Sequence, residues 1–250
     1  MAQGAPKFAT SRPLQSAVGR PPTTGDMLGQ RFMFKPAWWH DRIQQPKWTS
    51  FLDSLPEVDD KPDRRWIDRR TLLTTSRAEP CRALVAAYVW GTGDQAFVVP
   101  RRARMFAAND SEVIEDRLGQ VRAILDNDGD DAVAEAYRAL SRHGTAWLRY
   151  LGPSFFTKVL YALDAHGEAP GRALILDQFV IIALNDLCGT ALPERASWNT
   201  PTYLAWLSFA REQAQRLSDD LGAEVRPDAV EFMLFQQGKN VTARRKSGRR

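Results

Sequence analysis

Apolar residues recur along most of this chain at the spacing of helices that bury a face, and short polar or glycine-containing segments separate these stretches. The pattern predicts helices over residues 79–90, 111–126, 131–143, 155–165, 178–188, 200–221 and 227–238. No segment alternates apolar and polar residues between hairpin turns, and only residues 96–99 pass as a strand candidate. The fold class predicted from the pattern is mostly α.

Residues that commonly begin and end helices support these boundaries. The expected N-terminal caps are Asp110 or Ser111, Asp130, Ser154, Asp177 and Thr200. The expected stops are Gly91-Thr92-Gly93, His166-Gly167, Gly189, Gly222 and Gly238. Pro201 and Pro227 suit the first turns of the last two helices, because a proline there gives up no helical hydrogen bond.

The composition is that of a folded protein. Of 250 residues, 44% are hydrophobic and 10% aromatic, enough for one domain or for two halves around one cleft. The longest apolar stretches, residues 83–90 and 173–184, are too short to span a bilayer. Residues 1–22 lack the apolar core of a secretion signal. We therefore expect a cytoplasmic protein that does not bind membranes.

The sequence offers no binding motif for a cofactor. Cys81 and Cys188 cannot supply the four thiolates of an iron–sulfur cluster, and the three histidines fall in no metal-binding spacing. The acidic segment 126–131 lacks the glycine and glutamate that a calcium loop needs. No glycine-rich phosphate loop ends in Lys-Ser or Lys-Thr. We expect neither a metal nor a cofactor.

Cationic residues are gathered more closely than the net charge of +4 suggests. The clusters are Arg64, Arg65, Arg69 and Arg70, then Arg101, Arg102 and Arg104, then residues 239–250. Such clusters suit a phosphate backbone. For each cluster alone, a solvated surface is the favoured interpretation.

Residues 147–163 are typical of a helix, a tight turn and a second helix. The backbone N–H groups at the start of the second helix can bind a phosphate of any sequence. Lys158 follows this turn inside an apolar segment, and Asp177 stands nineteen positions later before another apolar helix. An ordinary surface lysine and an ordinary helix cap are the structural alternatives for these two residues.

Residues 151–184 resemble the hairpin and following helix of the helix-hairpin-helix DNA glycosylase superfamily, most closely the 8-oxoguanine DNA glycosylases. The resemblance implies that Lys158 is the nucleophile and that Asp177 assists it. It also implies a glycosylase-like fold of two helical halves around a cleft, a monomer, and double-stranded DNA as the partner. The DNA-binding positions it implies are Gly152, Pro153, Ser154, Phe155, Phe156, Thr157 and Thr92.

The last predicted helix adds a candidate substrate pocket. Residues 85–94 resemble the helix and loop that face the lesion in those enzymes. Glu231 and Phe235 fall where those enzymes carry a polar residue that recognises the base edge and a Phe that stacks on the base. Residues four apart share a helix face, so these two side chains can form two sides of one pocket. A carboxylate accepts hydrogen bonds from the two donors of a guanine-type edge, which favours a damaged or modified guanine.

The chain also departs from the family pattern. The usual Leu-Pro-Gly-Val-Gly hairpin is replaced by Gly152-Pro153-Ser154-Phe155-Phe156, so both hairpin glycines are absent. Side chains at these positions alter the shape of the turn or weaken its grip on a phosphate. Residues 1–70 show no resemblance. The chain is therefore expected to be a divergent member.

The resemblance and the element pattern together predict three segments. We expect a flexible leader over residues 1–25, a helical glycosylase-like domain over residues 26–238 with its helix-hairpin-helix at about 145–165, and a basic tail over residues 239–250. The expected activity is a DNA glycosylase with β-lyase activity through a lysine Schiff base. The alternatives are a catalytically inactive DNA-binding protein and a glycosylase that acts on modified foreign DNA.

Overall fold

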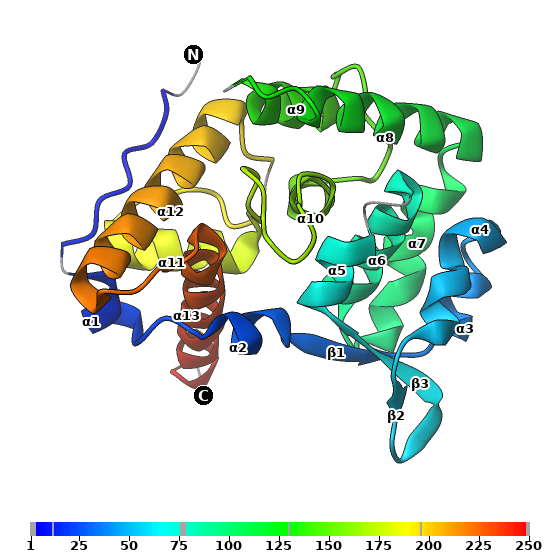
Figure 1. The fold of residues 1–250 in the computed structure, drawn as a ribbon, viewed down its shortest axis with the longest axis horizontal. Coiled ribbons are helices and arrows are strands. Elements are labelled where there is room, and N and C mark those ends of the chain that lie inside the picture. Colours follow the sequence, from blue (N-terminus) through cyan, green and yellow to red (C-terminus); the bar gives the residue numbers. More distant parts are fainter. Residues whose placement is uncertain (1–3, 12, 76–78, 130, 196, 249–250) are drawn as a thin grey trace. The chain divides into compact units, whose positions relative to one another are not determined.

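The computed structural model describes residues 4–11, 13–75, 79–129, 131–195 and 197–248. These residues are mostly helical, as the sequence pattern predicts, with one small sheet (Figure 1). The chain forms two compact units, Leu28–Ala173 and the pair of segments Met1–Met27 and Leu174–Arg250. No helix in the described ranges has the length and apolar character needed to cross a bilayer.

The unit Leu28–Ala173 contains the sheet and most of the short helices. Its elements are β1 (Arg31–Phe34), α3 (Ala37–His40), α4 (Pro46–Thr49), the 3-10 helix η1 (Ser50–Ser54), β2 (Glu57–Val58), β3 (Lys61–Asp68), α5 (Arg69–Thr75), α6 (Pro80–Thr92), the 3-10 helix η2 (Ala96–Val98), α7 (Val99–Ala107), α8 (Ser111–Leu125), α9 (Ala132–Leu140) and α10 (Pro153–Leu163).

Helix α6 forms the centre of this unit. Every residue from Ala83 to Trp90 is buried, which explains why the sequence there is apolar on all sides. Helices α5, α8 and α10 all pack against it. The core of the unit therefore holds α10, which carries Lys158, directly on α6.

The three-stranded sheet was not predicted. Its order is β1-β3-β2 with antiparallel pairs, and Phe34 lies opposite Arg65 on one side while Glu57 lies opposite Arg65 on the other. Strand β3 is polar along most of its length and buries only Ile67. Because little of the strand faces a core, it lacks the alternation that identifies strands in a sequence.

The strand predicted at residues 96–99 is wrong. Ala96–Val98 form a 3-10 helix and Val99 begins α7. Pro100 lies in the first turn of α7, where its missing N–H costs no helical hydrogen bond. The apolar run is short, and a short run does not distinguish a strand from a buried helix.

The other unit, Met1–Met27 with Leu174–Arg250, is built on three long helices. Its elements are α1 (Leu14–Val18), α2 (Thr24–Leu28), α11 (Gln178–Cys188), α12 (Thr200–Leu221) and α13 (Pro227–Ser247), coloured dark blue and yellow to red in Figure 1. Helix α2 extends one residue into the next unit. Helix α13 packs along α11 and α12.

The predicted end of the last helix at Gly238 is wrong, because α13 continues to Ser247. A Cβ atom on Gly238 would lie 2.0 Å from the backbone oxygen of Phe179 in α11. The glycine therefore allows two helices to approach closely, and it does not end one. Most of the predicted basic tail is the last part of this helix, up to Ser247.

Several predicted boundaries are confirmed. Helix α8 begins at Ser111 with Asp110 as its cap, and α11 begins after Asp177 and ends before Gly189, which adopts a left-handed conformation. The helix predicted to end near Gly222 does so. These boundaries depend on local backbone chemistry, which a sequence shows directly.

Other predicted caps are wrong by one or two residues. Gly152 caps α10 in place of Ser154, because Pro153 occupies the first helical position. Asn199 caps α12 in place of Thr200, and its side chain accepts a hydrogen bond from the N–H of Thr202 at 2.9 Å. Helix α6 includes Gly91 and Thr92, two of the three residues predicted to stop it, and ends at the third, Gly93, whose φ of 63° suits a glycine. The predicted cap Asp130 lies outside the described residues.

The segment before α10 differs most from its prediction. We expected a helix from Trp147 into a tight turn, but α9 ends at Leu140 and residues 141–152 form turns and irregular chain. His143 and Tyr150 have positive φ angles of 70° and 68°. The predicted helix at Trp147 is therefore wrong, and a twelve-residue connection leads into α10.

The predicted leader contains ordered structure. Helix α1 lies within it and α2 begins at its end, and the ring of Phe8 contacts that of Phe209 in α12 at a centroid distance of 5.9 Å. Its flexibility stays a prediction.

Candidate active site

Lys158 lies in the second turn of α10 and is 5% exposed. Its Nζ atom donates a hydrogen bond to the backbone oxygen of Ser154 at 2.8 Å. The same atom lies 6.0 Å from the ring centroid of Trp90 and 5.8 Å from that of Phe155. The structural alternative for this residue, a lysine on a solvated helix face, does not fit this burial.

Helix α6 provides the space that the lysine side chain occupies. A Cβ atom on Gly91 would lie 3.1 Å from Cδ of Lys158 and 3.0 Å from Cε1 of Phe155. A side chain at Gly91 would therefore compete directly with the lysine. Sequence reasoning treated Gly91 as a helix stop and missed this contact, although a glycine inside an apolar helix commonly marks a close approach.

An aromatic stack holds the start of α10 against α6. The rings of Phe155 and Tyr88 are stacked with centroids 4.4 Å apart, and the guanidinium carbon of Arg102 lies 4.6 Å from the Phe155 centroid. Burial raises the pKa of Tyr88 above its ordinary value, so its hydroxyl stays protonated and donates to the backbone oxygen of Tyr150 at 3.4 Å. A cation and two rings thus fix the helical turn that precedes Lys158.

Most of the implied DNA-binding positions have buried side chains. Phe155 and Phe156 belong to the core, and Phe156 contacts the ring of Tyr137 at 4.8 Å. Thr157 is fully buried and donates to the backbone oxygen of Pro153 at 2.8 Å. Thr92 is 5% exposed, at the end of α6. Only Gly152 is exposed, and Pro153 and Ser154 are partly exposed.

The backbone at the start of α10 keeps few free donors. The N–H groups of Phe155 and Phe156 both donate to the oxygen of Gly152, at 2.9 and 3.0 Å, and Pro153 has no N–H. A phosphate approaching this end could therefore bind the N–H of Ser154, together with the exposed backbone of Gly152. This is a smaller binding surface than we expected of a hairpin anchor.

In the other unit, Asp177 is the cap of α11. Its Oδ1 atom accepts hydrogen bonds from the N–H groups of Phe179 at 2.9 Å and of Val180 at 3.2 Å. The side chain is 8% exposed. The positive end of the helix dipole and these two donors therefore surround the side-chain oxygen. The capping role expected of Asp177 is thus confirmed, and a cap of this kind does not preclude catalysis.

Glu231 and Phe235 lie one turn apart on α13, as their spacing predicts. Glu231 is 1% exposed. Phe235 contacts the ring of Phe179 at a centroid distance of 5.4 Å, two residues beyond Asp177, and the Nζ atom of Lys239 lies 5.6 Å from its centroid. The face of α13 that carries Phe235 is therefore close to the start of α11.

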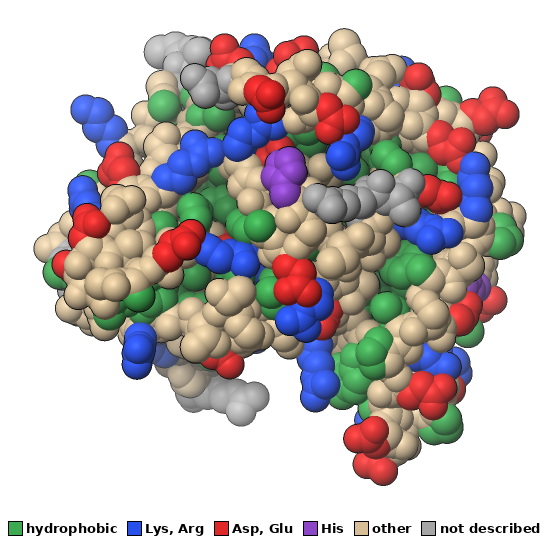
Figure 2. Space-filling view, in the orientation of Figure 1, with side chains coloured by type: hydrophobic (Ala, Val, Ile, Leu, Met, Phe, Trp, Pro, Cys, Tyr) green, Lys and Arg blue, Asp and Glu red, His purple; other side chains and the backbone are tan. Residues whose placement is uncertain are grey.

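The arginine clusters are only partly available to a nucleic acid. Arg69 is fully buried and donates to the side chain of Gln30 at 2.9 Å. The prediction that its cluster contacts phosphates is therefore wrong for this residue. Arg70 pairs with Glu168 at 2.7 Å, and Arg65 with Glu57 at 3.0 Å. Figure 2 shows Lys and Arg side chains intermixed with Asp and Glu side chains.

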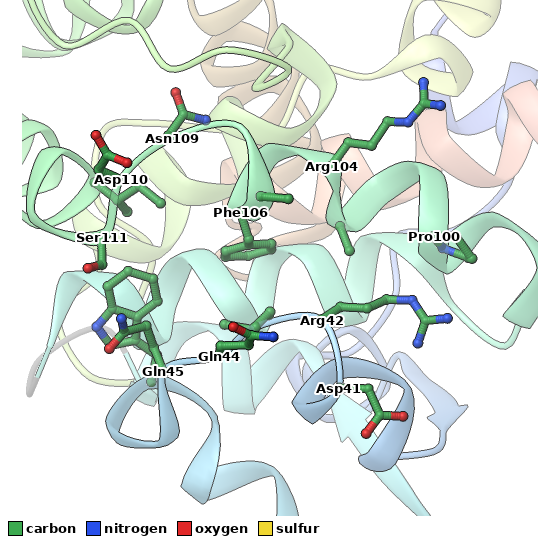
Figure 3. A pocket seen from close by; sticks show the side chains of 15 residues that line it. Asp41, Arg42, Gln44, Gln45, Pro100, Arg104, Phe106, Asn109, Asp110 and Ser111 are labelled. Atoms are coloured by element: carbon green, nitrogen blue, oxygen red, sulfur yellow. The ribbon is translucent and has the colours of Figure 1, made fainter.

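The unit Leu28–Ala173 contains a groove of about 620 Å³, beside α7 and the start of α8. Figure 3 shows Arg104 and Phe106 on one wall and Arg42 and Gln44 on the other, with the two arginine side chains extending to the same side of the view. It is lined by neither Lys158 nor any of the other predicted site residues. Sequence reasoning gave no sign of this groove.

The two cysteines are not poised as thiolates. Burial raises the pKa of Cys81 to about 12 and that of Cys188 to about 11. Within the described residues, no group of three or more His, Cys, Asp or Glu side chains is arranged to hold a metal ion.

Comparison with known proteins gives one match. The model of the family described as "Putative 8-oxoguanine DNA glycosylase OGG-like protein" matches residues 25–235. No curated protein and no solved structure is similar enough to match the chain.

Proposed function

Since this chain belongs to the family described as "Putative 8-oxoguanine DNA glycosylase OGG-like protein", we propose that it removes a damaged or modified purine, preferably a guanine derivative, from duplex DNA. The single observation that carries the proposal is Lys158, a lysine buried against Gly91 and two aromatic rings in the core of a family member. An ionisable side chain buried among aromatic rings is a candidate for a functional role.

The proposed chemistry begins with the uncharged Nζ atom of Lys158. It attacks C1′ of the sugar, and the bond from C1′ to N9 breaks with its electron pair leaving on the purine, which takes up a proton. Opening of the sugar ring then gives a C1′=N Schiff base. Loss of a C2′ proton with departure of the 3′ phosphate would complete β-elimination.

Asp177 has the proposed role of stabilising positive charge on the sugar as the base leaves. Its support is the position of the side chain at the start of α11, where two backbone donors fix one of its oxygens. This role is electrostatic and needs no proton transfer.

Glu231 and Phe235 are the proposed recognition residues for the extruded base. A carboxylate at Glu231 would accept from the two donors of a guanine-type edge and would repel the lone pair that adenine presents there. Phe235 is only partly buried, so part of its ring remains available for stacking. A preference for guanine derivatives follows from this pair.

Binding to the duplex would rest on the backbone at Gly152 and Ser154 and on exposed arginines of α7 such as Arg101. These contacts do not depend on the base sequence of the DNA, which suits an enzyme that searches for rare bases.

Borohydride trapping tests enzyme class and nucleophile together. The protein is incubated with borohydride and duplexes that carry 8-oxoguanine, other oxidised purines, alkylated purines or purines of the kind that DNA-modifying enzymes make, and covalent protein–DNA adducts are resolved by denaturing electrophoresis. We expect an adduct with a guanine derivative, because borohydride reduces the Schiff base to a stable amine. Lys158→Gln should abolish the adduct, whereas Lys61→Gln, at an exposed position in the β2–β3 hairpin, should leave it unchanged.

Two results would contradict the proposal in different ways. Duplex binding without any adduct or base release across the panel would favour the inactive DNA-binding protein. An adduct that persists in Lys158→Gln would assign the chemistry to another amine. An adduct only with bases that arise by enzymatic modification would favour the foreign-DNA glycosylase over a repair enzyme.

A further inference from the structure

Phe179, in the first turn of α11, contacts both Asp177 and Phe235. Its N–H donates to Oδ1 of Asp177 at 2.9 Å, and its ring meets the ring of Phe235 at a centroid distance of 5.4 Å and an angle of 84°. All three residues belong to the unit formed by Met1–Met27 and Leu174–Arg250. One residue therefore links the ring proposed to stack on the base with the carboxyl group proposed to assist the departure of the base.

Helix α13 also contacts the backbone of Phe179. A Cβ atom on Gly238 would lie 2.0 Å from the backbone oxygen of Phe179 and 2.6 Å from its carbonyl carbon. Gly238 stands three residues after Phe235, so both contacts come from the same face of α13. Phe179 is thus held at its ring and at its carbonyl group, while its N–H donates to Asp177. A displacement of the Phe235 ring therefore acts on the residue that caps with Asp177.

The chain that leads into Asp177 is fixed from another direction. The backbone oxygen of Leu174 accepts from the hydroxyl of Tyr203 at 2.9 Å, and that of Ile175 accepts from the indole N–H of Trp206 at 3.2 Å. Both donors belong to α12 and are fully buried. Because this segment is anchored, a change at the start of α11 alters the orientation of the Asp177 carboxyl group and does not move the whole segment.

An edge-to-face pair of phenylalanines is common in protein cores and alone implies no function. Phe179 and Phe235 differ from a core pair because both are only partly buried. The surface beside Phe235 also carries a cation, since the Nζ atom of the exposed Lys239 lies 5.6 Å from its ring centroid. A ring that is partly open to solvent can accept a stacked base, and the contact behind it can respond to that base.

We propose that Phe179 is a positioning residue that couples occupancy of the base site to the Asp177 carboxyl group. The inference rests on the proposed glycosylase function and concerns its specificity. A base stacked on Phe235 limits the motion of that ring, and the edge contact passes the restriction to Phe179. The N–H of Phe179 then holds Oδ1 of Asp177 in one orientation. A base that fits the ring is therefore released faster, and not only bound more tightly.

Amide exchange measures the coupling without relying on excision. The full-length protein is mixed with an undamaged duplex or with one that carries 2′-fluoro-8-oxodeoxyguanosine, whose glycosidic bond resists cleavage, and exchange is followed by NMR. We expect the amides of Phe179 and Val180, which both donate to Asp177, to exchange at least about fivefold more slowly with the lesion duplex. Phe235→Leu should lose this difference. Phe8→Leu, which removes an edge-to-face ring contact elsewhere in the same unit, should keep it.

Single-turnover kinetics provide the second measurement. Phe179→Leu keeps the backbone N–H but loses the ring edge, and we expect it to excise 8-oxoguanine about tenfold more slowly while duplex affinity changes by less than about twofold. Phe179→Tyr, which keeps the ring, should stay within about threefold of wild type. Strand cleavage at a preformed abasic site involves no stacked base, so Phe179→Leu should leave that rate unchanged. A folding defect would lower both rates.

A double-mutant cycle separates the coupling from a purely structural role. In the background of Asp177→Asn, Phe179→Leu should slow excision by less than about twofold, because the charge that Phe179 positions is already absent. The full loss of about tenfold in that background would overturn the proposal, since independent effects multiply.

The outcomes distinguish this inference from the proposed function. Equal amide exchange with the two duplexes, in a protein that excises the lesion, would overturn the coupling and leave the glycosylase intact. Protection that depends on Phe235, in a protein that excises nothing, would support the coupling and overturn the proposed activity. A protein that binds neither duplex would overturn both.

Discussion

Gly91 and Lys158 are in contact across the packing of α6 on α10, because the glycine leaves open the space that the lysine side chain fills. A methyl group at position 91 would lie 3.1 Å from Cδ and 3.2 Å from Cε of the lysine. The end of a lysine side chain can move by a few tenths of an ångström without unfolding the protein. The position of the amine is therefore sensitive to this one glycine.

We predict that Gly91→Ala folds but forms the borohydride adduct about 10- to 100-fold more slowly, since a small displacement of a nucleophile lowers the rate strongly. Single-turnover adduct formation and duplex affinity should be measured together, and the affinity should change little. Gly119→Ala, at an exposed site in α8 with open space around it, is the matched control. A rate equal to wild type in Gly91→Ala would show that the contact does not position the amine.

Asp177 has two separable roles, and the choice of substitution distinguishes them. Asparagine caps helices about as well as aspartate, as Asn199 does for α12, but it carries no charge. We predict that Asp177→Asn keeps the thermal stability of the protein while lowering excision by about 100-fold or more. Asp177→Ala should lose both the activity and about 1 kcal/mol of stability.

Thermal unfolding and single-turnover excision of the two Asp177 variants are the measurements. An asparagine variant as active as wild type would reduce Asp177 to a helix cap. The same comparison at Asn199, where Asn199→Asp should be neutral in both measurements, controls for the effect of a charge at a helix start.

The outcomes at individual residues show what the sequence can and cannot specify. Asp177 was identified as a helix start because capping depends on an oxygen and two nearby N–H groups of the same segment. Gly238 was taken as a helix stop by the same local reasoning, and the reasoning was wrong. Its role is set by Phe179, which is 59 residues away in the sequence.

The segment before α10 shows the same limit. Residues 141–152 contain no proline and no two adjacent glycines that would mark an irregular connection. They nevertheless form an irregular connection, which is fixed by Asn109 and by the hydroxyl of Tyr88. The burial of Lys158 in the core was likewise beyond sequence reasoning, because it depends on the neighbours that α6 supplies. The local chemistry of the site was predictable, and its packing was not.

We predict that stability falls as the pH rises from about 9 to 12. Burial, aided by the neighbouring Glu115, raises the pKa of Cys81 from 9.0 to about 12, so the folded protein keeps a proton that the unfolded chain releases in this window. The free energy of unfolding then decreases with pH, because the unfolded state binds fewer protons. The contribution is complete below pH 9 and is lost toward pH 12.

Urea denaturation at several alkaline pH values measures this effect. Cys81→Ala should flatten the decrease, and Cys188→Ala should flatten it less, because burial raises the pKa of Cys188 only to about 11. Tyr88 and Tyr137, whose pKa values burial also raises, remain in both variants and keep part of the slope. An identical pH profile for Cys81→Ala and wild type would remove Cys81 as a cause.

Gly238→Ala should destabilise the protein, in contrast to the usual gain from replacing a helical glycine. Alanine is favoured over glycine in a helix by about 1 kcal/mol, and Gly119→Ala should show this gain because its added methyl group meets nothing within 4 Å. At Gly238 the methyl group would overlap the backbone oxygen of Phe179, which cannot rotate away as a side chain can. Helices α11 and α13 must then separate, and we expect a loss of about 3 kcal/mol. Equal shifts of the two variants in thermal unfolding would show that the two helices do not need this close approach.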